Sequence, residues 1–163
     1  MSSFDFEYKR SLDLSQPTVE KVHVAANQTI VAGNLLVVSS GRAAKAAAAA
    51  AYNTVLGVAL ADITTGGTVG DDDVIPVLIL TQYAVLRATY LPGASKTSLA
   101  AGDKFGTMYD IDVNGTTGKQ TVNLGDTTGG FLKVVGYDND NKTVDVIVAA
   151  GHLWNSCQVA EGD

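Results

Sequence analysis

The chain has 163 residues, and its 11 basic and 17 acidic side chains give a formal net charge of −6 with both histidines neutral. This length fits one domain or two small ones, and the acidic balance argues against nucleic acid as a partner. Only 17% of the residues are charged and 7% are aromatic, whereas 46% are hydrophobic and 17 are glycine. Such a composition predicts a thin core built from strands, with part of the surface covered by a partner.

The first segment, residues 1–18, is expected to be an extended N-terminal arm. Its aromatic and charged side chains alternate with the period of a strand. A strand in this position needs a sheet edge, so we expect it to dock on a neighbouring subunit, with a disordered leader as the alternative. Removing residues 1–17 should then leave a folded domain. With the last large apolar residue of the chain added, the predicted partner interface is Phe4, Phe6, Tyr8, Leu12, Leu14 and Trp154.

The second segment, residues 19–155, is a succession of short apolar runs and turn signals, and a polar tail follows at 156–163. This pattern predicts an all-β fold, a small β-barrel or β-sandwich. Pro76 cannot donate a ladder hydrogen bond, so its strand is expected at a sheet edge or at a bulge. The run Ala46–Ala51 is either a short helix or a tightly packed loop. Strands are predicted over 35–39, 55–60, 74–80, 83–88, 131–137 and 143–148.

Two stretches of the chain echo each other at a spacing of 69 residues. Residues 29–35 and 98–104 share Ala-Gly followed by Asn or Asp, and each is followed by strands of which one contains a glycine. Two related β units are one interpretation and chance is the other.

Few residues are available for catalysis or metal binding. Cys157 is the only cysteine, which excludes an intrachain disulfide and a multi-cysteine zinc site. His23 and His152 lie near opposite ends of the chain without an orienting group suggested by spacing. The acidic runs Asp71–Asp73 and Asp138–Asn141 lack EF-hand spacing and fit turns equally well. We expect no enzyme, no cofactor and no metal site.

The N-terminus does not have the basic and apolar regions of a signal peptide, and no apolar stretch reaches the roughly 20 residues of a membrane helix. We therefore expect no membrane association and synthesis in the cytosol.

The succession of Ile30–Val38, Gly41-Arg42-Ala43-Ala44-Lys45-Ala46, Val55–Ile63 and a following apolar strand resembles the head decoration proteins of tailed bacteriophages, also called capsid cement proteins. The resemblance covers residues 25–80 and, more loosely, 98–150. It implies a virion structural protein, made in the host cytoplasm, that binds the major capsid protein on the outer capsid surface and stabilises the shell by bridging capsomers. It also implies a homo-oligomer, with a trimer favoured over a dimer. A head or tail fibre component and a carbohydrate-binding β-sandwich remain as alternatives.

Overall fold

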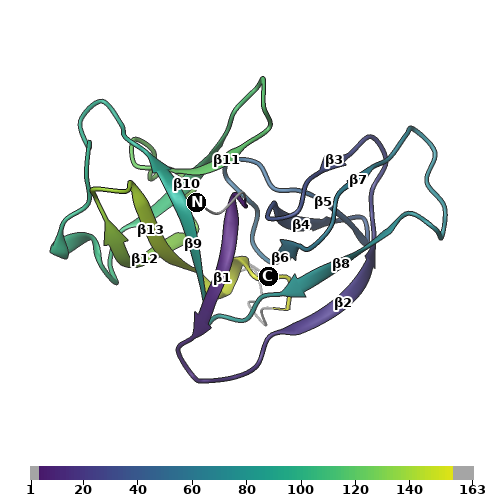
Figure 1. Ribbon diagram of the computed structural model, residues 1–163, viewed down its shortest axis with the longest axis horizontal. Coiled ribbons are helices and arrows are strands. Elements are labelled where there is room, and N and C mark those ends of the chain that lie inside the picture. Colours follow the sequence, from purple (N-terminus) through teal and green to yellow (C-terminus); the bar gives the residue numbers. More distant parts are fainter. Residues whose placement is uncertain (1–3, 156–163) are drawn as a thin grey trace, which may run out of the picture.

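Strands dominate the computed structural model, which describes residues 4–155 (Figure 1). The predicted all-β fold is confirmed, and it contains a closed five-stranded barrel. The predicted polar tail, 156–163 with Cys157, lies outside the described residues. The elements are β1 (Phe6–Ser11), β2 (Thr18–His23), β3 (Thr29–Ile30), β4 (Leu35–Ser39), β5 (Arg42–Lys45), β6 (Val55–Ala59), β7 (Ile63–Thr64), β8 (Val74–Ile79), β9 (Ala84–Leu91), β10 (Met108–Val113), β11 (Gln120–Asn123), β12 (Leu132–Asp138), β13 (Thr143–Val148) and the single 3-10 turns η1 (Ala101–Asp103) and η2 (Ala150–His152).

The C-terminal half of the chain forms the closed barrel, which we name barrel 1. Its strands follow one another in the order β9, β11, β10, β12 and β13, and β13 pairs with β9 to complete the ring. All neighbours are antiparallel except β9 and β11, which run parallel. Each strand of the ring therefore has a neighbour on both sides over at least part of its length.

The N-terminal half forms a second unit, barrel 2, in which the sheet order is β2, β8, β6, β4 and β5. One parallel bridge between Val24, just after β2, and Ala43 of β5 brings the two outer strands of this sheet together. The short ribbon of β3 and β7 lies beside it. Barrel 2 is therefore closed at one end of β2 only.

The two barrels have the same strand order. When β2, β4, β5, β6 and β8 are matched to β9, β10, β11, β12 and β13, every antiparallel pair has its counterpart, and so does the parallel contact that closes each ring. The echoed sequences share a side-chain contact, since Asn34 accepts from the Val31 N–H at 2.9 Å and Asp103 accepts from the Ala100 N–H at 2.7 Å. Their backbones differ, because Gly33 has a positive φ of 94° whereas Gly102 lies in the 3-10 turn η1. A duplication remains a prediction, but its two units now have matching topology.

β1 completes the molecule by pairing antiparallel with β9, from Phe6 opposite Ala88 to Ser11 opposite Ala84. The strand predicted in the arm therefore forms, but the edge it uses belongs to the same chain. That edge is open because β11 pairs with β9 only from Tyr90 onward. The docking of β1 on a neighbouring subunit is a wrong expectation for residues 6–11.

A buried polar joint connects the two barrels. Gln120 of β11, fully buried, accepts from the Leu35 N–H at 2.6 Å and donates to the carbonyls of Leu35 and Ala46 at 3.0 and 2.9 Å. The Asp5 carboxylate accepts from the Gln120 N–H at 2.8 Å and from the Asn34 side chain at 2.9 Å. The Gln120 side chain thus bridges the Leu35 N–H and the Ala46 carbonyl, beside the bond from the Ala46 N–H to the Leu35 carbonyl at 2.9 Å, and it holds barrel 2 against barrel 1.

Gln120→Ala is expected to lower the free energy of unfolding by about 2–4 kcal/mol, because it leaves buried backbone groups of Leu35 and Ala46 unpaired and opens a cavity. Urea unfolding followed by circular dichroism measures this. Gln16→Ala, in an exposed loop, is the matched control and should change stability by less than about 0.5 kcal/mol. Equal stability of the two variants would contradict the role assigned to the joint.

Two local expectations have different outcomes. β8 pairs on both sides, with β2 and β6 and without a bulge, so the expectation of an edge or bulge at Pro76 is wrong. Pro76 is tolerated because it lies at the end of the pairing with β6: its carbonyl accepts from the Leu60 N–H at 3.0 Å, and only the return bond from residue 76 is missing. The Ala46–Ala51 run is a loop, the second of the two alternatives. Barrel 1 holds it, since the Ala49 N–H donates to Asp110 at 2.6 Å.

Candidate functional site

The structure divides the predicted partner interface into buried and exposed residues. Phe6 is 0% exposed and belongs to the main core, and Tyr8 is half-buried against the same core. Phe6 is not available to a partner, because the pairing of β1 with β9 turns this face of the strand inward, and Tyr8 on the same face stays partly accessible. Phe4, Leu12, Leu14 and Trp154 are exposed. Of these four, Phe4 precedes β1, whereas Leu12 and Leu14 follow it.

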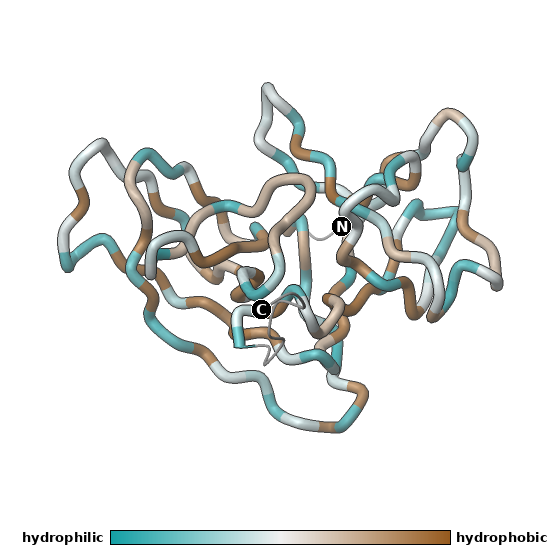
Figure 2. The backbone as a smooth tube through the Cα atoms, turned by 180° about the vertical axis from the view of Figure 1, so that it is seen from behind, coloured by the Kyte–Doolittle hydropathy of each residue, from teal (hydrophilic) through white to brown (hydrophobic). Residues whose placement is uncertain are grey.

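Leu12 and Leu14 lie where the chain passes between the two barrels. The link from β1 to β2 and the link from β8 to β9 run next to each other, since the Leu12 N–H donates to the Tyr83 carbonyl at 2.9 Å. Both links pass from one barrel to the other in the lower part of Figure 1. In Figure 2 the loop at the bottom of the view carries brown, hydrophobic segments. Tyr83 is exposed as well. Three large exposed side chains, Leu12, Leu14 and Tyr83, therefore lie on these two neighbouring links.

Trp154, at the end of the described chain, lies near the start of the β8–β9 link. Its N–H donates to the Val55 carbonyl at 2.9 Å, next to the point where the Leu80 N–H donates to the Leu56 carbonyl. Trp154 and the start of the β8–β9 link thus pair with consecutive residues of β6. We name the group Leu12, Leu14, Tyr83 and Trp154 the connector surface.

Leu14 is the most unusual residue of the connector surface. It is 88% exposed and adopts a positive φ of 63°, a conformation that costs an L-residue other than glycine roughly 1–2 kcal/mol. The turn is held locally: the Leu14 N–H donates to the Ser11 carbonyl at 3.3 Å, and Asp13 accepts from the Ser15 N–H and hydroxyl. These hydrogen bonds lower the pKa of Asp13. An apolar side chain is thus held out in solvent in a strained conformation.

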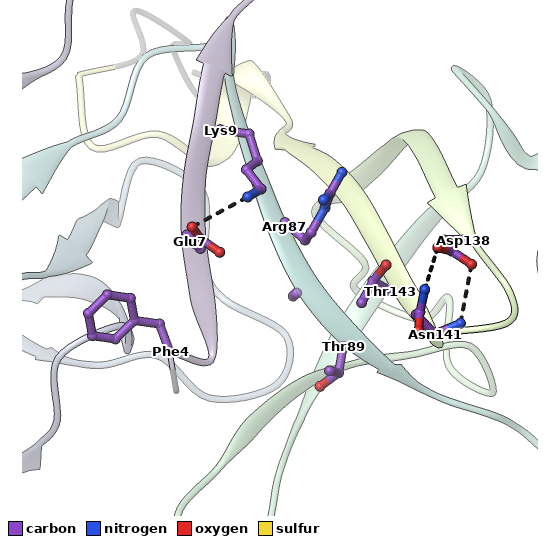
Figure 3. A pocket seen from close by; sticks show the side chains of 9 residues that line it. Phe4, Glu7, Lys9, Arg87, Thr89, Asp138, Asn141 and Thr143 are labelled. Atoms are coloured by element: carbon purple, nitrogen blue, oxygen red, sulfur yellow. Dashed lines mark hydrogen bonds and ion pairs between the residues drawn. The ribbon is translucent and has the colours of Figure 1, made fainter. Parts of the chain in front are cut away.

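A polar groove of about 360 Å³ lies on the outer face of β1, β9 and β13 (Figure 3). Its charges are compensated within the chain. Lys9 contacts Glu7 at 3.3 Å, and Arg87 binds both carboxylate oxygens of Asp145 at 2.7 and 3.0 Å, which raises the pKa of Arg87. Asp138 accepts from the backbone and side chain of Asn141, and these bonds lower its pKa. Such paired groups favour a structural role over a reactive one.

A second groove, of about 440 Å³, lies between the alanine loop and barrel 1. Tyr52 and His152 line it with their rings 4.4 Å apart, and His152 Nδ1 lies 2.9 Å from the Ala50 carbonyl. Beneath it, burial raises the pKa of Asp110, whose two carboxylate oxygens accept the N–H groups of Ile111 and Ala49. The histidine and the carboxylate are both engaged with backbone groups.

Within residues 4–155, no three or more His, Cys, Asp or Glu side chains gather where they would hold a metal ion. The two acidic runs form turns: Asp73 accepts from the Gly70 N–H, and Asp138 accepts from the N–H groups of Asp140 and Asn141. No helix in the described residues is long and apolar enough to cross a bilayer.

Sequence reasoning missed Tyr83 and Gln120. Tyr83 follows an apolar strand and carries no pattern that separates it from the strand residues, and Gln120 is a polar residue in a Gly/Thr-rich stretch. Only the pairing of distant segments reveals either one. No protein-family model matches the chain, and no curated protein matches its sequence.

Proposed function

We propose that this protein is a decoration protein of a tailed phage: a non-catalytic virion component that binds the major capsid protein on the outer capsid surface. The connector surface is its contact with the shell, and binding across capsomers stabilises the assembled particle. The observation that carries the proposal is Leu14, an apolar side chain held in solvent at a positive φ. Strained conformations cluster at functional sites, and Leu14, unlike the equally strained Phe105, lies beside the exposed Leu12 and the Tyr83 link.

The rest of the molecule is compatible with this role. A protein that binds the assembled shell and not its separate parts stabilises the shell by mass action, so it needs contacts and no chemistry. Two barrels joined through a buried polar network form a stiff body for such contacts. The net charge of −6 suits a component that faces solvent over most of its surface. As in the resemblance, we propose a homo-oligomer, with a trimer favoured over a dimer, which native mass measurement tests.

Carbohydrate binding is the second candidate, and the groove beside Tyr52 favours it. Tyr52 is 65% exposed and lies against His152 beside this groove, which therefore has the aromatic lining common in sites for small ligands. A glycan array separates the two functions, because a decoration protein should give no hits. A head or tail fibre component, the remaining alternative, is distinguished by its position on the particle in electron microscopy.

Leu14→Asn is expected to weaken binding to capsid shells by at least tenfold while raising the free energy of unfolding by about 0.5–1 kcal/mol. Asparagine tolerates the positive φ that leucine does not, and the lost side chain is hardly buried in the free protein. Co-sedimentation with purified shells measures the binding, and urea unfolding measures the stability.

Phe105→Asn is the matched control. Phe105 is also exposed, at 66%, and also has a φ of 63°, but it lies before β10 and far along the chain from the connector links. It should gain stability to a similar extent and keep full binding. Full binding by Leu14→Asn, or equal losses in both variants, would count against the connector surface.

A further inference from the structure

β2 has an open edge within the described part of the chain. The strand pairs with β8 over its whole length, from Thr18 opposite Ile79 to His23 opposite Val74, and no other strand of residues 4–155 pairs with it until Val24 bridges β5. Five of its six residues are exposed, and in Figure 1 no element lies beyond β2 on the side away from β8. An open edge of this length, without a bulge or an internal proline, can accept another strand.

The backbone groups that line this edge can be identified. The Pro76 carbonyl accepts from the Leu60 N–H at 3.0 Å, so residue 76 turns its carbonyl toward β6 and away from β2. Residues opposite each other in an antiparallel pair either exchange both hydrogen bonds or exchange none. Lys21 lies opposite Pro76, so Lys21 and, two residues earlier, Val19 direct their N–H and C=O groups toward the open edge.

Barrel 1 has an added strand at the corresponding place. The counterpart of β2 is β9, and its start pairs with β1 before the contact at Tyr90 closes the ring. Val85 lies five residues before Tyr90, as Val19 lies five residues before the closing contact at Val24. Val85 pairs with β1 and is fully buried, whereas Val19 is 52% exposed. The valine that an added strand covers in barrel 1 is thus uncovered in barrel 2.

The charges of β2 restrict how a second copy of this chain can pair with the edge. A two-fold axis that pairs β2 with itself in one continuous sheet keeps each residue on its own face, so one residue lies opposite itself at the axis. Glu20 or Lys21 at the axis would place like charges directly opposite each other, which is destabilising. Val19 at the axis places no like charges opposite each other and brings two exposed valines together.

The neighbouring uncharged registers are poorer for the main chain. With Thr18 at the axis, Val19 lies opposite Pro17, which has no N–H to donate to the Val19 carbonyl. With Val22 at the axis, the partner strand would have to pair with Val24, which already bridges β5. The register centred on Val19 avoids both conflicts.

The register centred on Val19 also supplies complementary contacts. The two Val19 residues exchange both of their outward main-chain hydrogen bonds, and each Lys21 N–H lies opposite a Pro17 carbonyl that can accept it. Thr18 lies opposite Glu20, so its hydroxyl can donate to the carboxylate across the edge. The edge is therefore complementary to itself, as a two-fold interface requires.

We propose that the open edge of β2 pairs with the same edge of a second copy of this chain, antiparallel across a two-fold axis at Val19. Main-chain hydrogen bonds supply the affinity, and the charges at Glu20 and Lys21 select the register. The inference rests on the proposed function in one respect, since it names the surface that forms the homo-oligomer. A two-fold edge builds a dimer, so it favours the dimer over the trimer that the resemblance implies.

Analytical ultracentrifugation of the full chain over a range of concentrations tests the inference. The unmodified chain should reach the mass of two chains. Val19→Lys and Val19→Glu each place like charges opposite each other at the axis, so each should raise the dimer dissociation constant by about tenfold or more. An equimolar mixture of the two variants should form a dimer again, because opposite charges then meet at the axis. Val31→Lys is the matched control, since Val31 is 48% exposed and lies outside β2, and it should dimerise like the unmodified chain.

Two further measurements address the same register. The two Glu20 side chains lie diagonal to each other across the axis, about 7–8 Å apart, so Glu20→Gln should tighten the dimer. Hydrogen–deuterium exchange of the unmodified chain should slow by about tenfold or more at the Val19 and Lys21 amides when the concentration is raised to form the dimer. The amides of Glu20 and Val22 should change little, because they already face β8.

The outcomes separate this inference from the proposed function. A monomer or a trimer at every concentration overturns the two-fold edge, and so does a dimer that both charged variants leave intact. Co-sedimentation with purified shells is scored independently: shell binding by a monomer or trimer leaves the decoration function standing, whereas a dimer that binds no shells overturns the decoration function and leaves the edge. The mass and the amide exchange of the unmodified chain remain decisive even where a variant fails to fold.

Discussion

Phe6→Ala is expected to lower the free energy of unfolding by about 3–5 kcal/mol, the range for truncating a fully buried aromatic ring. Phe6 is 0% exposed and contributes to the core that both barrels share with β1. Its N–H also donates to the Gly33 carbonyl at 2.9 Å, so the strand is fixed to barrel 2 as well as to β9. Urea unfolding monitored by circular dichroism gives the change.

Phe105→Ala is the control for this variant, because the Phe105 residue is 66% exposed and its ring should contribute less than about 0.5 kcal/mol.

The burial of Phe6 also reverses one expectation from the sequence. Removal of residues 1–17 should not leave a folded domain, since it deletes Phe6 and uncovers the flank of β9. A stable truncated protein, or equal losses at Phe6 and Phe105, would show that β1 is dispensable.

Gly57→Ala is expected to destabilise the protein by about 3 kcal/mol or more. A Cβ at this position would lie 2.1 Å from the Leu78 carbonyl oxygen and 2.8 Å from Cγ1 of Val77. Gly57 belongs to β6, which is paired on both sides, so neither backbone can move away without breaking ladder hydrogen bonds. Overpacking that the surroundings cannot relax has costs of this order.

Gly66→Ala provides the comparison, since a Cβ there meets nothing within 4 Å and its φ is not in the left-handed region. Its stability should stay within about 0.5 kcal/mol of the unmodified chain. Thermal unfolding of both variants is sufficient, because the expected difference is a large share of the stability of a domain of this size. An unchanged Gly57→Ala melting temperature would mean that β6 and β8 are less closely paired than described.

Several of the longer strands could be predicted from their apolar runs. The predicted segments 35–39, 55–60, 74–80 and 143–148 coincide with β4, β6, β8 and β13 to within a residue at each end. These strands are rich in valine, leucine and isoleucine, so their local preference agrees with their place in the sheet. Agreement between local preference and tertiary position is the condition under which sequence reasoning succeeds.

β10 and β11 escaped prediction because their sequences hide their burial. Met108–Val113 contains Asp110 and Asp112, yet Asp110 is buried with its carboxylate bonded to backbone N–H groups. Gln120 begins β11 and is likewise buried. A polar residue can enter a core only where distant segments satisfy it, and composition and periodicity contain no information about those segments. The connector surface was likewise predicted only in part. The sequence indicated Leu12, Leu14 and Trp154, but not Tyr83 on the neighbouring link.

The pairing of β1 with β9 has a consequence for synthesis. β1 leaves the ribosome before any of barrel 2, but its partner residues, up to Ala88, follow only after the whole of barrel 2 has been made. Contacts so distant in sequence form late, and their slow closure exposes aggregation-prone strands. Barrel 2, whose strand pairs all lie within residues 18–79, can fold first on the nascent chain, with the N-terminal strand and its Phe6 waiting in solvent. A cell that produces this protein in quantity must keep Phe6 from meeting other chains during that interval.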